Sequence, residues 1–233
     1  MLVERGVFES RAKARAAIEA GQVQADGRPV TSPAQYVRAG AVLNGKPAHP
    51  WVGRGGVKLD HALTVWPVAV EGRVVLDVGA STGGFTQVCL TRGARRVYAV
   101  DVGRGQLHPA VAADPRVVDL QATDARCLTP ALIPETPELI VSDVSFISLT
   151  KALPVPLSLA AAVADLVVLV KPQFELESRT APRFVHDQQE VHAAVRRVAD
   201  WLREEGWTMR GVEDSPIAGG DGNREYLLWA NRP

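Results

Sequence analysis

The segment 74–86 constrains the fold of this chain more than any other part of the sequence. It reads VVLDVGASTGGFT, in which an apolar run leads into a loop with glycines at 79, 83 and 84. Glycine permits backbone angles that other residues avoid, and it lets a ligand approach the main chain. A strand, a glycine-containing loop and a following helix form the first unit of a doubly wound sheet that binds a nucleotide-like ligand.

The same order of elements continues along the chain. Apolar stretches that fit buried strands alternate with stretches of helical periodicity, which predicts an α/β fold with a mostly parallel, Rossmann-like sheet. A helix opened by Asp187 and Glu190 as a capping box, and ended by Gly206, precedes two last strands. The strands are expected at 74–78, 97–100, 117–120, 139–141, 166–170, 207–212 and 226–229, after a short helix whose apolar stripe runs from Leu59 to Trp66.

A smaller segment precedes this pattern. Ser10 is placed to cap a helix that ends at Gly21, and Asp26-Gly27 is a hairpin-turn signal. Short strands are expected at 23–25, 28–30 and 41–43, and a stretch with two prolines follows them. We therefore expect a small α+β domain at 1–45, a linker at 46–54 and the α/β domain at 55–233.

Charge is distributed unevenly, although the chain carries 26 basic and 26 acidic residues. Residues 1–60 hold nine Lys and Arg against five Asp and Glu, which leaves +4, and the remainder is then −4 (17 − 21). A basic head on an acidic body suggests a module that binds a polyanion, and ordinary variation in composition is the alternative. The candidate phosphate contacts are Arg5, Arg11, Lys13 and Arg15.

Other features bear on where the protein works. No apolar run reaches the roughly 18 residues that a membrane helix needs, and charges at Glu4, Arg5 and Glu9 do not fit a signal peptide. Two cysteines in apolar stretches cannot make a disulfide framework. We expect a cytoplasmic protein with no membrane partner, and we identify no candidate metal ligands.

The glycine loop also indicates the ligand. A dehydrogenase would read G-x-G-x-x-G, whereas this loop reads GASTGG and begins two residues after Asp77. An acid there suits S-adenosylmethionine, because it can face the ammonium group of the ligand. Asp101 ends the second strand and suits the ribose hydroxyls, and Asp124 follows the third strand, where it could receive the adenine amine. The predicted cofactor-binding residues are Asp77, Gly79, Ala80, Ser81, Thr82, Gly83, Gly84, Phe85, Asp101 and Asp124. A nucleotide-like fold that does not bind this cofactor is the alternative.

The reaction type depends on residues after the later strands. Enzymes that methylate base amines usually carry (N/D)-P-P-(Y/F) after the fourth strand, whereas this chain reads SDVSF at 142–146. Its cysteines also lie away from the place of a carbon-methylating nucleophile. Lys171 instead ends the fifth strand, where a lysine is costly unless it is paired.

Four ionisable residues are expected to meet at one edge of the sheet. Ligands of doubly wound sheets bind at the carboxyl ends of the parallel strands, where Asp143 and Lys171 lie. In methyltransferases of this type the last strand is antiparallel, so Glu225 stands at the same edge, and Lys58 opens the helix before the sheet. Any one of them could be a surface charge, but together they form a candidate catalytic cluster of Lys58, Asp143, Lys171 and Glu225.

Several segments of the chain resemble a known family. RGGVK, LDVGASTGGFT, DVSFIS, VKPQFE and GNREY resemble the TlyA family of rRNA methyltransferases, which is related to the FtsJ-like ribose methyltransferases and is also labelled haemolysin A. The N-terminal LVERGVFESR resembles the S4 RNA-binding domain of that family. The resemblance implies S-adenosylmethionine-dependent 2′-O-methylation of cytidine in 23S and, in some members, 16S rRNA within ribosomal subunits. It also implies a catalytic tetrad, which falls here on the four charged residues named above.

Two rival functions are compatible with the sequence. The family label suggests a membrane-damaging haemolysin, against which the lack of an apolar span counts. A non-catalytic RNA-binding protein with a methyltransferase fold is the other rival, against which the complete tetrad counts. The loop 176–187 departs from the family pattern of glycines and basic residues followed by VRD, so the resemblance assigns it no substrate contacts.

Overall fold

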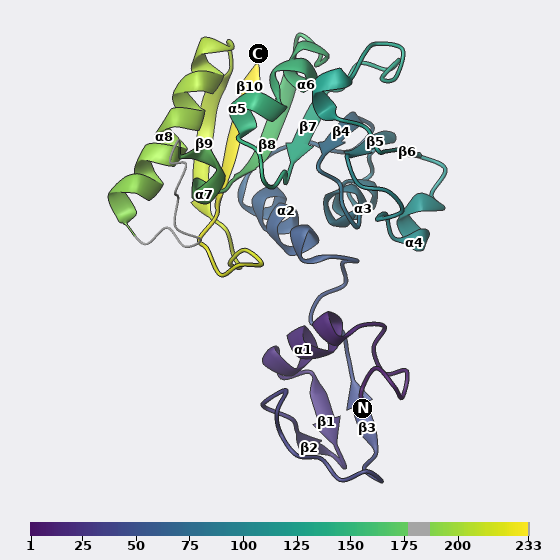
Figure 1. Ribbon diagram of the computed structural model, residues 1–233. Coiled ribbons are helices and arrows are strands. Elements are labelled where there is room, and N and C mark those ends of the chain that lie inside the picture. Colours follow the sequence, from purple (N-terminus) through teal and green to yellow (C-terminus); the bar gives the residue numbers. More distant parts are fainter. Residues whose placement is uncertain (177–186, 233) are drawn as a thin grey trace. The chain divides into compact units, whose positions relative to one another are not determined.

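The computed structural model describes residues 1–176 and 187–232 (Figure 1). Contacts between residues divide the chain into two compact units, Met1–Pro50 and Trp51–Pro233. The division falls inside the stretch 46–54 with its two prolines. Most of the divergent loop, residues 177–186, lies outside the described residues.

The first unit is a three-stranded antiparallel sheet with one helix. Its elements are α1 (Arg11–Glu19), β1 (Val23–Ala25), β2 (Arg28–Pro29) and β3 (Leu43–Gly45), and the strand order is β2-β1-β3. Ser10 caps α1, as predicted, by accepting a hydrogen bond from the Lys13 N–H at 3.2 Å. Ala17, Ile18 and Val23 pack in its small apolar core.

The strand predicted at 41–43 was placed wrongly. It runs over Leu43–Gly45, with Leu43 opposite Ala25. The preceding Val42 meets the hairpin turn instead, because it exchanges backbone and side-chain hydrogen bonds with Asp26. Val42 therefore belongs to the contacts of the turn, although the apolar pattern predicted it as part of the strand.

The second unit contains a seven-stranded sheet with the order β6-β5-β4-β7-β8-β10-β9. The expected fold is confirmed, since β4 to β8 are parallel neighbours and β10 runs antiparallel between β8 and β9. The strands are β4 (Val74–Val78), β5 (Arg96–Asp101), β6 (Val117–Gln121), β7 (Leu139–Ser142), β8 (Ala164–Val170), β9 (Thr208–Asp214) and β10 (Tyr226–Arg232). The helices are α2 (Arg54–Val65), α3 (Gly84–Thr91), α4 (Pro109–Ala112), η1 (Ala125–Cys127), α5 (Leu149–Ala152), α6 (Pro154–Ser158), α7 (Pro172–Glu175) and α8 (Gln188–Glu204).

Helices cover both faces of this sheet (Figure 1). Side chains alternate between the two faces of a strand, so Val75 of β4 packs with α2 and α3 while Leu76 packs with α5, α6 and α8. Asp187 caps α8 by accepting a hydrogen bond from the Gln189 N–H at 2.8 Å. In the described part of the chain, no helix is both long and apolar enough to cross a membrane.

The sheet topology gathers loops from distant parts of the sequence at one edge. The parallel strands β4, β5, β7 and β8 all end there, and the antiparallel β10 begins there, with Tyr226 opposite Val170. The strand order reverses direction between β4 and β7, which is where ligands of doubly wound sheets bind. The residues just beyond these strand ends therefore form the candidate site.

Candidate active site

The glycine loop after β4 follows a path that side chains would block. Gly79 has φ +85°, and a Cβ there would lie 3.0 Å from the backbone nitrogen of Val144 in the loop after β7. Gly83 has φ +88° as the residue that precedes α3, and its Cβ would lie 2.6 Å from Leu107. Ser81 also takes a left-handed φ of +48°, although it is not glycine. Ser81 and Thr82 are exposed and Gly79 is half-buried, so this part of the loop is open to a ligand.

This loop forms one wall of a cavity of about 660 Å³ at the carboxyl edge of the sheet. Of the predicted cofactor-binding residues, Gly79, Ala80, Ser81, Thr82, Gly84 and Phe85 line it. All four predicted catalytic residues line it too. Asp77, Gly83, Asp101 and Asp124 are not among its lining residues.

Asp77 lies beneath the loop and is fully buried. Its Oδ2 accepts a hydrogen bond from the Thr86 hydroxyl at 2.6 Å, and its Oδ1 has no hydrogen-bond partner among the described residues. Burial raises the pKa of Asp77 to about 7, although the bond from Thr86 opposes that shift. The structure therefore does not bring this carboxylate to the cavity, where the sequence placed it. Thr86 stood inside the quoted glycine motif, but nothing in the pattern marked it as a partner.

The other two predicted acids, Asp101 and Asp124, accept hydrogen bonds from backbone N–H groups. Asp101 accepts hydrogen bonds from the Ser81 N–H at 2.8 Å and the Gly103 N–H at 2.7 Å, so it fixes the strained residue of the glycine loop. Asp124 caps η1 through the Arg126 N–H and pairs with the Arg126 side chain at 2.6 Å. Hydrogen bonds from Arg126 lower the pKa of Asp124.

The first pair of charged residues joins α2 to the start of β10. Lys58 Nζ lies 2.5 Å from Glu225 Oε2, and their side chains are only 5% and 3% exposed. Such a pair is costly to desolvate, and removing either partner alone leaves an uncompensated buried charge. The pair thereby fixes the loop before β10 against the helix that precedes the sheet.

The second pair joins the loops after β7 and β8. Lys171 Nζ lies 2.6 Å from Asp143 Oδ1, donates to the Ser145 hydroxyl at 2.7 Å and to the Asp143 carbonyl at 3.3 Å. An ammonium group has three hydrogens, so these three acceptors account for all of them. Among the three, Ser145 is uncharged, exposed and lines the cavity.

The rim of the cavity holds residues that sequence reasoning did not single out. Phe146 is 90% exposed, has φ +66°, and its ring centroid lies 5.3 Å from that of Phe174. Gln173 donates to Asp221 at 3.2 Å and so connects α7 to the loop before β10. Only their position in the sequence could have indicated these residues, because they lie in the same segments as Asp143, Lys171 and Glu225. Among the described residues no group of acidic, His and Cys side chains could hold a metal ion.

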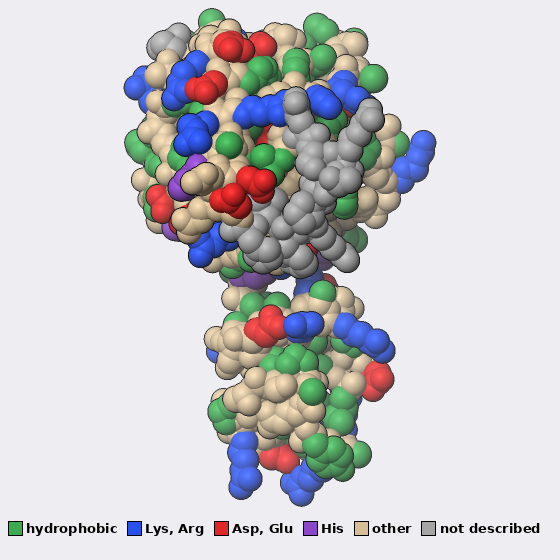
Figure 2. Space-filling model, turned by 60° about the vertical axis from the view of Figure 1, so that its left-hand side comes forward, with side chains coloured by type: hydrophobic (Ala, Val, Ile, Leu, Met, Phe, Trp, Pro, Cys, Tyr) green, Lys and Arg blue, Asp and Glu red, His purple; other side chains and the backbone are tan. Residues whose placement is uncertain are grey.

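The four predicted phosphate contacts of the first unit differ in their surroundings. Arg5 donates to the carbonyls of Ala39 and Ala41, so part of its role is to hold the backbone. Lys13 pairs with Glu9 and Arg15 pairs with Glu19 along α1. Arg11 is exposed on the same helix. On the face seen in Figure 2, acidic side chains lie among the basic ones on both units.

Comparison with known proteins gives consistent matches along the whole chain. The sequence model of the FtsJ-like methyltransferase family matches residues 51–232, and that of the S4 domain matches residues 1–43. The 16S/23S rRNA (cytidine-2′-O)-methyltransferase TlyA of Mycobacterium tuberculosis is 47% identical over 98% of this chain and 87% of its own. Hemolysin A of Brachyspira hyodysenteriae is 37% identical over 95% of this chain and 94% of its own. A solved structure of a protein described as a hemolysin from Streptococcus thermophilus matches with a TM-score of 0.79 and 35% identity, over 99% of this chain and 86% of its own.

Proposed function

The chain belongs to the TlyA family of rRNA methyltransferases, and we propose that it transfers a methyl group from S-adenosylmethionine to the 2′-hydroxyl of a cytidine in ribosomal RNA. The observation that carries this proposal is the pair of ion pairs, Lys58–Glu225 and Lys171–Asp143, in the wall of one cavity beside the glycine loop. The relative from Mycobacterium tuberculosis is named for this reaction on 16S and 23S rRNA.

The residues present fit the methyl donor. Gly79, Ala80, Ser81, Thr82 and Gly84 line the cavity. The left-handed φ of Gly79 and Gly83 lets the loop pack closely against Val144 and Leu107, where a Cβ would clash. Asp101 supports the same loop through the Ser81 N–H. S-adenosylmethionine supplies an electrophilic methyl group when it is bound.

Lys171 is the residue that orients the ribose hydroxyl in this proposal. A hydroxyl is a poor nucleophile at neutral pH and needs a positioned group within hydrogen-bond reach. Asp143 keeps the amine in place through its carboxylate, whereas the bond to Ser145 faces the cavity and can be exchanged for a bond to the ribose oxygen. A fixed ammonium group beside that oxygen also stabilises negative charge that develops on it. Positioning the oxygen against the methyl group supplies much of the rate.

The first unit supplies the RNA contacts in this proposal. Its match to the S4 domain, together with the exposed Arg11, supports phosphate binding by this unit. The proposal takes rRNA within ribosomal subunits as the substrate and the cytoplasm as the place of the reaction.

Methylation of purified ribosomal subunits tests the function directly. The protein is incubated with subunits and S-adenosylmethionine, and the rRNA is digested and mapped by mass spectrometry. We expect one methyl group on the ribose of a cytidine. Methyl transfer to a base would contradict the proposed chemistry, and RNA binding without any transfer would favour the non-catalytic rival.

A further inference from the structure

The charges in the cavity wall are almost entirely neutralised by one another. The described lining residues include three cations, Arg54, Lys58 and Lys171, and three acids, Asp143, Asp221 and Glu225. Lys58 and Lys171 are buried and each is paired with one of the acids. The charge of each lysine is therefore already balanced by a neighbouring carboxylate.

Arg54 differs from both lysines. It is exposed, and within the described part of the chain no acidic side chain lies within ion-pair distance of it. Its backbone is fixed as the first residue of α2, and its guanidinium lies against Gly220, where a Cβ would be 2.9 Å from Nη2. Arg54 thus stands between the start of α2 and the loop before β10, at a position that lines the cavity.

A positive charge at the edge of the cavity would favour the binding of RNA, whose phosphates are negatively charged. Without Arg54 the ionised side chains of the wall would sum to one negative charge, which repels a polyanion. Each ribose in RNA is flanked by phosphates, so a ribose that reaches Lys171 brings phosphates to the outer part of the cavity. A guanidinium matches the oxygens of a phosphate with two parallel donors.

We propose that Arg54 binds a backbone phosphate next to the target ribose and so positions the RNA strand in the active site. The inference rests on the proposed function and assigns an anion site to it. The carboxylate of the methyl donor is the other anion available to this residue, and the test below separates the two.

The test uses the full-length protein with Arg54→Gln and Arg54→Lys. Methylation of rRNA is followed at several KCl concentrations, RNA binding is measured separately by filter retention, and cofactor affinity by calorimetry. We expect Arg54→Gln to raise KM for RNA about tenfold at low salt. The slope of log affinity against log salt should fall by about 0.7–0.9, the contribution of one released counterion. Cofactor affinity should stay within about twofold, and Arg54→Lys should retain most of the slope, because it keeps the charge.

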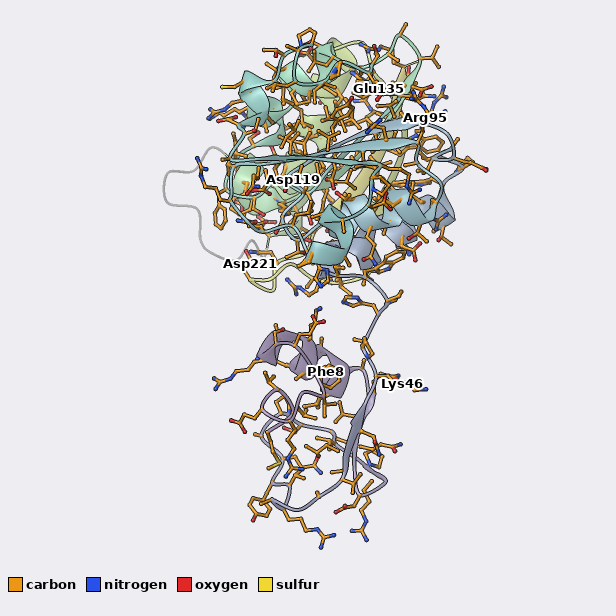
Figure 3. The ribbon with its side chains drawn as sticks, turned by 90° about the vertical axis from the view of Figure 1, so that its right-hand side faces the viewer. Phe8, Lys46, Arg95, Asp119, Glu135 and Asp221 are labelled. Atoms are coloured by element: carbon orange, nitrogen blue, oxygen red, sulfur yellow. The ribbon has the colours of Figure 1, made fainter. Side chains whose placement is uncertain are left out.

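Arg95→Gln is the matched control. Arg95 pairs with Glu135 at the edge of the sheet opposite to Asp221, as Figure 3 shows, and it does not line the cavity. It should leave KM and the salt slope unchanged. An unchanged slope in Arg54→Gln would overturn the inference, as would an equal change in Arg95→Gln. Weaker cofactor binding with unchanged RNA affinity would assign Arg54 to the donor carboxylate instead. Wild-type protein that binds RNA with the Arg54-dependent slope but transfers no methyl group would refute the proposed function and leave the phosphate site standing.

Discussion

Lys171 is the single residue on which the proposed chemistry depends most. Its amine is nearly enclosed, with a side chain 8% exposed, and it bonds Ser145, which lines the cavity with it. We expect Lys171→Ala and Lys171→Arg both to abolish methyl transfer, because arginine keeps the charge but has a wider fork that does not fit the same acceptors. Single-turnover assays with labelled donor on ribosomal subunits measure the loss.

Cofactor binding is the control for both Lys171 variants. Neither substitution touches the glycine loop, so calorimetry should show S-adenosylmethionine affinity close to that of the wild type. Transfer at the wild-type rate by Lys171→Ala would refute the mechanism. Activity in Lys171→Arg alone would show that charge and orientation suffice.

Asp101 gives a second prediction at this scale. Its carboxylate holds the Ser81 and Gly103 N–H groups, so Asp101→Ala releases the strained loop that the cofactor uses. We expect S-adenosylmethionine affinity to fall by about 1.5–3 kcal/mol, the usual loss for hydrogen bonds to a charged group. Equal affinities of the two proteins in calorimetry would show that the bonds of Asp101 to the loop do not support cofactor binding.

Asp77 makes stability depend on pH in an unusual direction. Its folded pKa of about 7 lies above the unfolded value near 3.9, so between these values the folded state holds the proton that the unfolded state has lost. The free energy of unfolding therefore falls as pH rises from about 4 to 7, by about 1.4 kcal/mol per pH unit. The Asp77→Asn variant has no carboxyl group to titrate, so its free energy of unfolding should not show this fall. Relative to the wild type, its free energy of unfolding should rise by about 3 kcal/mol between pH 5 and pH 8.

Urea denaturation at the two pH values measures that gain. Asp114→Asn is the matched control, because hydrogen bonds from Arg116 lower the pKa of Asp114 and keep it ionised throughout this range. Its effect on stability should be the same at both pH values. A difference between Asp77→Asn and wild type that does not change with pH would show that Asp77 is ionised in the folded protein.

The four residues of the two ion pairs could be predicted from the sequence, whereas Arg54, Asp221 and the uncharged partners in the site could not. Lys171 stood out because a charge that follows a buried apolar strand is costly unless it is paired. Glu225 stood out because an antiparallel last strand begins at the edge where the parallel strands end. Ser145 and Thr86 carry no such signal, since a hydroxyl is common in loops and helices alike, and its partner depends on the packing of segments that local sequence does not describe. Asp77 was predicted to face the ligand from its position before the glycine loop. The prediction failed because position in a motif does not show to which side of the strand end the carboxylate points.

The starts of α2 and α3 pack against each other through glycine. A Cβ at Gly84 would lie 2.8 Å from the Gly56 nitrogen and 3.3 Å from the Gly53 carbonyl oxygen, which are both backbone atoms. Gly84→Ala therefore forces the two helices apart. We expect a loss of about 1–3 kcal/mol in the free energy of unfolding, as for other overpacked sites, together with weaker cofactor binding.

Gly40→Ala is the control for that substitution. Gly40 has nothing within 4 Å of an added Cβ, and its φ is not in the left-handed region. Its stability in urea should stay close to that of the wild type. A Gly84→Ala protein as stable as Gly40→Ala would show that α2 and α3 can separate at little cost.

Long elements were easier to predict than short ones. The strand β8 is a run of seven mostly apolar residues and α8 shows a clear apolar stripe, so their patterns were visible. The four- and five-residue helices α4, α5, α6 and α7 are too short to show a helical period. The strand β3 was displaced because Val42 bonds to the turn at Asp26, and that contact between distant residues leaves no mark in local composition.

At the scale of the whole molecule, the two units are expected to divide the work. The described residues that line the cavity all belong to the second unit, and the S4 match lies in the first. Deleting residues 1–45 should therefore lower rRNA affinity at least about tenfold, since several phosphate contacts are lost together. Cofactor affinity should remain close to that of the full chain, because each unit has its own apolar core. Unchanged RNA affinity in filter binding would show that the first unit is not the RNA-binding module.

The Lys58–Glu225 pair also restricts how this protein can diverge. Either change alone leaves one buried charge without its partner, at a cost of about 3–5 kcal/mol. That is a large part of the roughly 5–15 kcal/mol by which a typical domain is stable. A lineage that replaces the two residues one at a time passes through an intermediate protein that is less stable by this amount. We therefore expect positions 58 and 225 to be inherited together among descendants of this chain, whereas the exposed partners Arg203 and Asp200 can change separately.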